Sequence, residues 1–278
     1  MKLRIATYNI HKGVTAFGRR ARIHGIKEAI DMLDADLVFL QEVQGQHDHH
    51  AFKHTQWPVE AQHHFLAGEN RHSAYGMNAV YEHGHHGNAL LSRFEIASTA
   101  NHDVSDHAYE QRGILHTVIR APAAEIHCFV IHLGLFAASR RRQVQALIRE
   151  IQTSLPPDAP LIIAGDFNDW SNSLNHTLYA ELGVSEVFDD GKHRGGIASS
   201  IASMPQRVAA MAGLGGGVKP KIKTGRTFPA GLPWLRLDRM YVRGFKVEHA
   251  QVMSGAPWTK LSDHVPIVAT LEYSPRQS

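Results

Sequence analysis

The chain has 278 residues, of which 43% are hydrophobic and 20% are charged, a composition typical of a soluble globular protein. Its formal net charge of +3 permits an anionic substrate but does not identify one. No apolar run approaches the length of a membrane span, and the first residues contain no apolar segment of the signal-peptide kind. The single cysteine, Cys128, excludes an internal disulfide framework and fits a reducing compartment. We therefore expect a cytoplasmic protein, with peripheral contact at the inner membrane surface as the alternative.

Two apolar runs separated by a helical segment open the chain. Residues 3–10 predict the first strand, and residues 11–22 predict a basic, glycine-containing loop. Apolar residues at helical spacing predict a helix over residues 24–33. Residues 36–42 predict a second strand that is apolar on both faces, which implies a covered sheet.

The region between residues 45 and 86 is irregular and rich in histidine. Residues 60–66 predict a helix and residues 73–81 a strand. The histidines suggest a zinc site, but no cysteine accompanies them and their spacing matches none of the common zinc motifs. We therefore expect His83, His85 and His86 to occupy solvated loop or rim positions.

Four strands and a long helix follow. Residues 87–92, 96–104 and 113–120 predict three consecutive antiparallel strands, and residues 125–132 a fourth, in which Cys128 is a buried structural thiol. Residues 140–155 predict a helix with one apolar face. Its basic start, Arg140-Arg141-Arg142, opposes the helix dipole and is best explained as a solvated face, with phosphate contact as the alternative.

The last third of the chain contains a buried strand, a helix and three further strands. The aliphatic run 161–164 ends at Gly165, Asp166 and Asn168, which predicts a buried strand followed by a turn that opens to solvent. Residues 174–182 predict a helix. The final strands are expected at residues 237–242, 247–253 and 265–273.

A basic segment precedes these final strands. Residues 191–237 contain eight Lys or Arg residues and no acid. Residues 197–211 have amphipathic helical spacing, and glycines follow at 213–217. The apolar face either packs on the rest of the fold or rests on an anionic membrane, and packing is the expected outcome. We expect Lys219, Lys221 and Lys223 to face an anionic substrate.

Many strands with few helices, and runs buried on both faces, predict two packed sheets with helices outside them. No linker or change in composition marks a boundary, so we expect residues 1–278 to form a single domain.

Polar side chains occur where six of the predicted strands begin or end. They are carboxylates, amides and imidazoles, namely Asn9, Glu42, His132, Asp166, Asn168, Asp238, Asp263 and His264. Each one alone has an ordinary structural explanation, but their joint placement at strand ends does not. Oxygen ligands without thiols suit Mg²⁺ or Mn²⁺ better than zinc, and such an ion beside imidazoles suits phosphoryl hydrolysis.

The motifs that carry these residues resemble, in the same order, the signature of the endonuclease/exonuclease/phosphatase (DNase I-like) superfamily. They are Tyr8-Asn9-Ile10, Leu40-Gln41-Glu42, His132-Leu133, Gly165-Asp166-Phe167-Asn168, Leu237-Asp238-Arg239 and Ser262-Asp263-His264. Within this superfamily, the chain is most similar to small, uncharacterised bacterial members. The resemblance implies a four-layer α/β/β/α sandwich of two mostly antiparallel sheets, and Mg²⁺-dependent cleavage of phosphoesters with Mn²⁺ as a substitute.

The resemblance also implies roles for individual residues. Glu42 is expected to be the principal metal ligand, supported by Asn9 and Asp263. Asp166 is expected to orient or deprotonate the attacking water, while Asn168 holds a phosphate oxygen.

The remaining roles concern the phosphate itself. Asp238 is expected to fix the tautomer of His264 so that the imidazole binds the scissile phosphate. His132 is expected to contact the phosphate or the leaving group, and Arg112 resembles a family arginine near the site.

The substrate stays open, because this family combines one catalytic centre with many different loops. Nucleic acid, phospholipid and inositol phosphate all remain candidate substrates, and the cleaved group is either a phosphodiester or a phosphomonoester. No obligate protein partner is expected. The alternative to a phosphodiesterase, nuclease or phosphatase is a metal-dependent module that binds an anionic lipid or nucleic acid without cleaving it.

Overall fold

The computed structural model describes residues 1–15, 20–47, 53, 57–106, 110–189 and 225–274. The helix predicted over residues 197–211, the glycines at 213–217, and Lys219, Lys221 and Lys223 lie outside the described residues.

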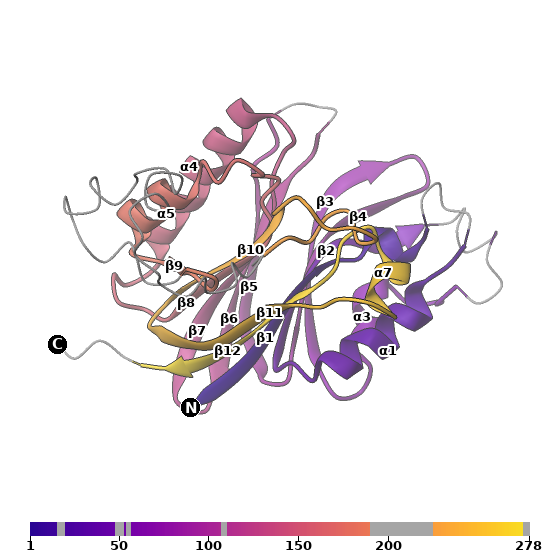
Figure 1. The fold of residues 1–278 in the computed structure, drawn as a ribbon, viewed down its shortest axis with the longest axis horizontal. Helices are drawn as coiled ribbons and strands as arrows, with labels where there is room; N and C mark the ends of the chain where they lie inside the picture. Colours follow the sequence, from indigo (N-terminus) through magenta and orange to yellow (C-terminus); the bar gives the residue numbers. More distant parts are fainter. Residues whose placement is uncertain (16–19, 48–52, 54–56, 107–109, 190–224, 275–278) are drawn as a thin grey trace, which may run out of the picture.

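Two six-stranded sheets pack face to face at the centre of the molecule (Figure 1). The first sheet has the order β11-β12-β1-β2-β4-β3 and the second the order β5-β6-β7-β8-β10-β9. The first contains β1 (Lys2–Asn9), β2 (Leu37–His47), β3 (His72–Tyr81), β4 (Gly84–Ser92), β11 (Phe245–Val252) and β12 (Ile267–Tyr273). The second contains β5 (Glu95–Asp103), β6 (Gly113–Ala121), β7 (Ala124–His132), β8 (Leu161–Asp166), β9 (Ser185–Glu186) and β10 (Asp238–Arg243).

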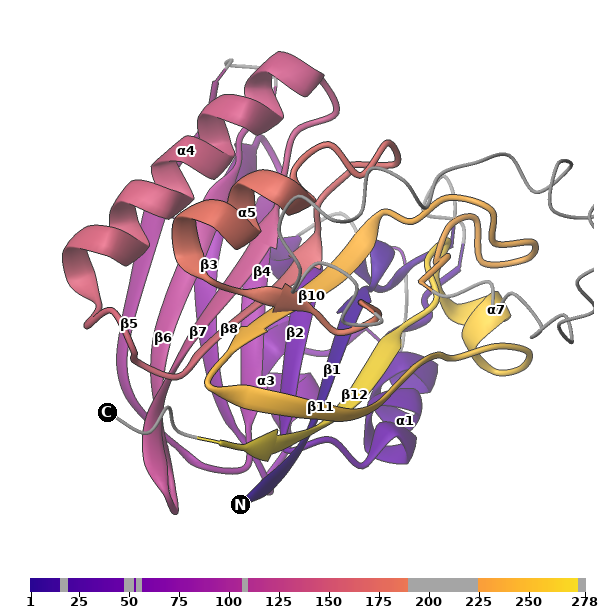
Figure 2. The ribbon, with the colours of Figure 1, turned by 60° about the vertical axis from the view of Figure 1, so that its left-hand side comes forward.

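The described helices cover the outer face of each sheet (Figure 2). The first sheet is covered by α1 (Ile23–Leu33), α3 (Gln62–Ala67) and α7 (Trp258–Leu261), and the second by α4 (Ala137–Ser154) and α5 (Asn175–Leu182). None of these helices is both long enough and apolar enough to cross a membrane. The expected four-layer α/β/β/α sandwich is confirmed.

The unbroken apolar runs arise because each central strand is buried on both faces. In β1, Leu3 and Ile5 pack between the two sheets, whereas Ala6 and Tyr8 pack against the layer of α1. Alternate side chains of one strand point to opposite faces of its sheet, so both sets of positions must be apolar.

Each sheet contains one parallel pair of strands, and all other pairings are antiparallel. The pairs are β1–β2, joined through α1, and β7–β8, joined through α4. The carboxyl ends of parallel strands meet at the same edge of a sheet. This arrangement brings Asn9 close to β2, and His132 next to Asp166.

One strand pairing and several boundaries differ from the expected ones. The strand over residues 87–92 does not pair with the next one, because β4 belongs to the first sheet and β5 to the second. Only Arg93 and Phe94 separate them, and the Phe94 N–H donates to Ser92 Oγ at 2.9 Å where the chain changes sheets. The second strand continues past Glu42 to His47, and α4 begins at Ala137 rather than Arg140.

Arg140 was expected on a solvated face, but it is buried beneath the start of α4. Its Nη1 donates to the carbonyl oxygens of Gly134 and Leu135, and its guanidinium lies 4.9 Å from the ring centre of Trp170. These carbonyl groups lie just before the helix, so the arginine stabilises the connection from β7 to α4.

Several histidines in the irregular region are partly buried, whereas solvated loop positions were expected. His85 and His86 lie in β4, and His63 stacks on Tyr75 at 4.7 Å. The Tyr75 hydroxyl hydrogen-bonds His85 Nδ1 at 2.9 Å. Burial lowers the pKa of His63 and of His86 to about 4, so both are neutral at pH 7. His63 packs between α3 and the sheet, whereas His86 lies beside Arg112 and His132.

Gly165 provides a test of the strand arrangement. Its φ is +150°, and an added Cβ would lie 2.0 Å from the Ile131 carbonyl oxygen of the neighbouring strand. Gly165→Ala should therefore lower the free energy of unfolding by about 2 kcal/mol or more, as measured by urea denaturation. Gly231→Ala is the matched control, because no atom of the described residues lies within 4 Å of the added Cβ there. Equal stability of the two variants would contradict the close approach of β7 and β8.

Candidate active site

Three adjacent strands of the second sheet place His132, Asp166 and Asp238 side by side. His132 pairs with Asp166 in the parallel β7–β8 register, and Asp238 pairs with Asp166 in the antiparallel β8–β10 register. All three are at least 90% buried. The row lies at the end of the sheet where β7 and β8 finish and β10 begins.

Asp166 lies at the centre of this row and contacts both sheets. Its Oδ1 accepts the Asn168 backbone N–H at 2.9 Å, and its Oδ2 accepts Asn9 Nδ2 at 3.2 Å from the opposite sheet. Burial raises the pKa of Asp166 to about 6, and Asp238 acts in the same direction. His264 and these two hydrogen bonds oppose the shift. The carboxyl group is thus held in a fixed orientation with a pKa close to neutrality.

Asp238 and His264 form a direct pair beside Asp166. His264 Nδ1 lies 2.7 Å from Asp238 Oδ2, while Nε2 faces Asp166 Oδ2 at 3.8 Å. Burial opposes protonation of this imidazole. The charge and hydrogen bond of Asp238 outweigh burial and raise the pKa of His264 to about 10. At neutral pH, a buried imidazolium therefore lies between two carboxylates.

The pKa of His132 is shifted in the opposite direction from that of His264. Its Nε2 lies 3.6 Å from Asp166 Oδ2. Burial, followed by the charge of Arg112, lowers the pKa of His132 well below the usual range. The site therefore combines one neutral imidazole with one charged imidazole, both within 4 Å of the same carboxylate oxygen.

Glu42 enters the site from a bulge in β2. The pairing of β2 with β4 changes register between Leu40 and Val43, and Glu42 has a left-handed φ of +55°. Glu42 Oε1 accepts Asn9 Nδ2 at 3.4 Å. The expected strand end at Glu42 is thus a mid-strand bulge, which directs this side chain toward the site.

The environment of Glu42 fits a bound cation. Its Oε2 is buried and accepts no hydrogen bond within the described part of the chain, although Lys12 Nζ lies 3.5 Å away. Burial is the strongest influence and opposes ionisation. Nearby His132, Lys12, His11 and His86 outweigh it and lower the pKa to about 2. At neutral pH, where His132 and His86 are neutral, Lys12 and His11 remain as the basic groups beside Glu42.

Asp263 lies at the open side of the site. Its side chain is 42% exposed, compared with 3% for Asp166. His11 Nδ1 lies 3.2 Å from Asp263 Oδ2. Burial opposes ionisation of Asp263 most strongly, but the bond to His11 and the charge of His264 outweigh it and lower the pKa.

Sequence reasoning assigned His11 and Lys12 only to a basic loop. Both have a left-handed backbone (φ +45° and +59°), and this turn brings them onto Asp263 and Glu42. The only sequence signal was their position directly after the first strand.

Asn9 presents its amide nitrogen to the carboxylates. Nδ2 contacts both Glu42 and Asp166, while Oδ1 accepts the His11 backbone N–H at 3.1 Å. In this orientation Asn9 is a donor that joins the two sheets. To coordinate a metal through oxygen, its amide would have to turn.

Near this centre, one group of ligands and one single carboxylate of the described structure could bind a metal. Asp166, Asp238 and His264 each have a potential ligand atom within 4.8 Å of the others. In this group, however, His264 Nδ1 is already bonded to Asp238. Glu42 is the better candidate, because its buried Oε2 accepts no hydrogen bond from the residues that the structure describes.

Asn168 and Arg112 meet at one backbone carbonyl group. Asn168 Nδ2 donates to the Leu133 carbonyl oxygen at 2.9 Å, and Arg112 Nε donates to the same oxygen at 3.3 Å. Arg112 also pairs with Glu110 at 3.4 Å. Together with His132, Arg112 lines a small niche at the edge of the site.

Two supporting residues were not identified from the sequence. Asp169 is fully buried, and its carboxylate accepts the Ser171 and Ser173 hydroxyls and the Leu174 N–H, each at 2.9 Å. Its carbonyl oxygen accepts Arg239 Nη2 at 2.7 Å. These bonds hold the turn that follows Asn168. In the sequence, the only indication of these two residues was their position: Asp169 follows the motif Gly165–Asn168, and Arg239 ends the motif Leu237–Arg239.

Comparison with known proteins shows one consistent relationship. The model of the endonuclease/exonuclease/phosphatase family matches residues 6–264. The uncharacterized protein YbhP of Escherichia coli K12 is 37% identical over 271 residues, covering 96% of this chain and 95% of YbhP.

Two solved structures share the fold. An endonuclease/exonuclease/phosphatase from Beutenbergia cavernae has a TM-score of 0.71 at 18% identity, over 98% of this chain and 72% of that one. The Bacteroides thetaiotaomicron mannosyl-6-phosphatase Bt3783 has a TM-score of 0.66 at 16% identity, over 98% of this chain and 100% of that one. The chain therefore belongs to the endonuclease/exonuclease/phosphatase family.

Proposed function

We propose that the protein is a Mg²⁺-dependent phosphoester hydrolase in which Asp166 orients and deprotonates the attacking water. Family members are metal-dependent phosphoesterases, which supports the reaction class. The observation that carries the proposal is the position of Asp166, with donors from both sheets and an imidazole on each side.

Glu42 would hold the metal ion, with Asp263 and a turned Asn9 as further ligands. Carboxylate and amide oxygens match the preference of Mg²⁺, and Mn²⁺ accepts the same set. When bound, the ion neutralises charge on the phosphate oxygens. Lys12 and His11, which now contact Glu42 and Asp263, would face the same negative charges.

The protonation state of each remaining residue determines its role. Asp166, with a pKa of about 6, is ionised at neutral pH yet basic enough to accept a proton from water. His264, held as a cation by Asp238, would bind a phosphate oxygen. Neutral His132 would donate a hydrogen bond to the phosphate or the leaving group. Asn168 and Arg112 would position the remaining oxygens.

Exposed apolar side chains on the loops that leave the site favour a substrate with an aromatic or apolar group. Leu135 and Phe136 follow His132, and Trp170 follows Asn168. Trp234, also exposed, donates its backbone N–H to the Phe228 carbonyl oxygen, and the ring centre of Phe228 lies 5.0 Å from that of His264. Such side chains stack on bases or enter a lipid surface, so nucleic acid and phospholipid fit better than inositol phosphate.

Substitution of Glu42 tests the proposed metal site. With Mg²⁺, we expect hydrolysis within a panel of DNA, RNA, phospholipid, inositol phosphate and a chromogenic phosphodiester. EDTA should abolish that activity, and excess Mg²⁺ should restore it. Glu42→Gln should lower kcat/KM at least about 100-fold while the thermal midpoint is maintained, because the carboxylate charge binds the ion.

Glu28→Ala is the matched control, since Glu28 is an exposed acid on α1. Activity of Glu42→Gln equal to that of Glu28→Ala, or activity that persists in EDTA, would contradict the metal mechanism.

The Asp238–His264 pair predicts coupled losses. Asp238→Asn should lower kcat about 100-fold or more with a much smaller change in KM, because it removes the charge that keeps His264 protonated. The double variant with His264→Ala should be no slower than His264→Ala alone. Steady-state kinetics on the chromogenic diester measure all four proteins, and losses that multiply would show that the two residues act separately.

A further inference from the structure

A row of histidines crosses the second sheet on the face covered by α4. His102 in β5 pairs with Ile114 of β6, and His116 lies two residues further along β6. His116 in turn pairs with Phe129 of β7, and His127 lies two residues before Phe129. Ile114 and Phe129 pack in the cluster beneath α4, so these alternate positions point toward the helix. The three imidazoles therefore form a diagonal row under α4, and none of them is a residue assigned to catalysis.

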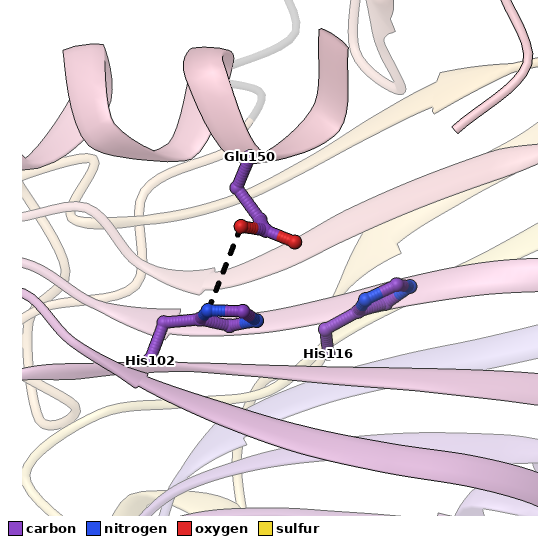
Figure 3. Close-up of side chains that lie close together, drawn as sticks. All are labelled: His102, His116 and Glu150. Carbon is purple, nitrogen blue, oxygen red and sulfur yellow. Dashed lines mark ion pairs between the residues drawn. The ribbon is translucent and has the colours of Figure 1, made fainter. Parts of the chain in front are cut away.

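Glu150 of α4 points onto this row (Figure 3). Its Oε2 lies 3.5 Å from His102 Nδ1. His102, His116 and Glu150 each offer one ligand atom, and the three atoms lie within 4.8 Å of one another. Three different elements, β5, β6 and α4, thus contribute one ligand atom each.

The hydrogen bonding of the row is incomplete. His102 Nε2 is buried and has no hydrogen-bond partner within the described ranges. His116 Nε2 lies 3.1 Å from His127 Nδ1, so one of these two nitrogens carries the shared hydrogen. If His116 is the donor, its Nδ1 has a free lone pair. A partnered outer nitrogen is also what a metal-binding histidine uses to fix its orientation.

The His116 imidazole is also in the protonation state that coordination requires. His116 stacks on Phe129 with ring centres 4.2 Å apart, and burial lowers its pKa to about 4. Burial lowers the pKa of His127 as well. At neutral pH, these rings therefore present lone pairs rather than charges.

We propose that His102, His116 and Glu150 bind a divalent transition-metal ion of the Zn²⁺ class at a site distinct from the catalytic centre. Two imidazoles and one carboxylate, with a further position for water, form a known ligand set for zinc, whereas Mg²⁺ prefers oxygen ligands alone. Ligand atoms around tetrahedral zinc lie about 3.4 Å apart. Side-chain rotations that shorten the distances between the three ligand atoms by about 1 Å would therefore complete the site.

Such an ion would connect the edge strand β5 to β6 and to α4. β5 ends the second sheet, with a neighbouring strand on one side only. Binding to the folded state alone stabilises that state, so the site is expected to anchor α4 on the sheet that carries His132 and Asp166.

Calorimetric titration of the full chain with Zn²⁺, in a saturating excess of Mg²⁺, tests the proposal. The wild type should bind one Zn²⁺ that is insensitive to Mg²⁺, and its thermal midpoint should rise by about 5 °C at 100-fold excess over Kd. His102→Ala, His116→Ala and Glu150→Gln should each weaken this binding at least about 10-fold and remove the thermal shift.

Controls separate this site from the other histidines and from the catalytic centre. His249→Ala is the matched variant, because His249 is an exposed histidine on β11 of the other sheet, and it should keep the tight Zn²⁺. Glu42→Gln should keep it as well. The proposal is overturned if no tight Zn²⁺ binds, if Glu150→Gln binds as the wild type does, or if the Zn²⁺ is lost in His249→Ala or Glu42→Gln. Glu150→Gln preserves the shape of the side chain, so the test does not depend on a disruptive substitution.

Discussion

The buried charge of Asp166 is the constraint on which the rest of the site depends. A carboxylate that is 3% exposed would be protonated or would destabilise the fold without compensating donors and cations. Asn9 Nδ2 and the Asn168 N–H supply the donors, and His264 supplies the cation. Because Asn9 belongs to the first sheet and Asp166 to the second, the polar contact that tunes the carboxyl group also joins the two sheets. The same hydrogen bond therefore both holds the two sheets together and influences the pKa of Asp166.

Backbone conformation does much of the positioning. Glu42 reaches the site through a bulge and a positive φ, and His11 and Lys12 reach their carboxylates through a left-handed turn. Asn168 also has a positive φ, of +50°. Such conformations are unfavourable for residues other than glycine, so the surrounding hydrogen bonds must maintain them. The bonds to Asp169 and Arg239 have this function on one side of the site. Around the active site, residues with positive φ therefore lie next to side chains that make several hydrogen bonds.

Much of the architecture was accessible from the sequence, because aliphatic runs that end in Asn9, His132 and Asp166 mark central strands and their functional ends. Features that depend on contacts between distant segments were not accessible. Nothing local distinguishes the connection at Arg93 and Phe94, where the chain changes sheets, from a hairpin. The bulge at Glu42 has no characteristic sequence. The row of His102, His116 and His127 appears only once strand register is known, since the three residues are up to 25 positions apart. Burial of Arg140 likewise depends on where α4 begins.

In the proposed mechanism, Asp166 orients and deprotonates the water that attacks phosphorus. The most direct measurement is kcat/KM of Asp166→Asn on the chromogenic phosphodiester with saturating Mg²⁺. This substitution keeps the shape of the side chain and its bond to the Asn168 N–H but removes the base. If Asp166 is the base, kcat/KM should fall about 1,000-fold or more while the fold is retained. Activity within about 10-fold of the wild type would show that Asp166 is not the base and that another group accepts the proton.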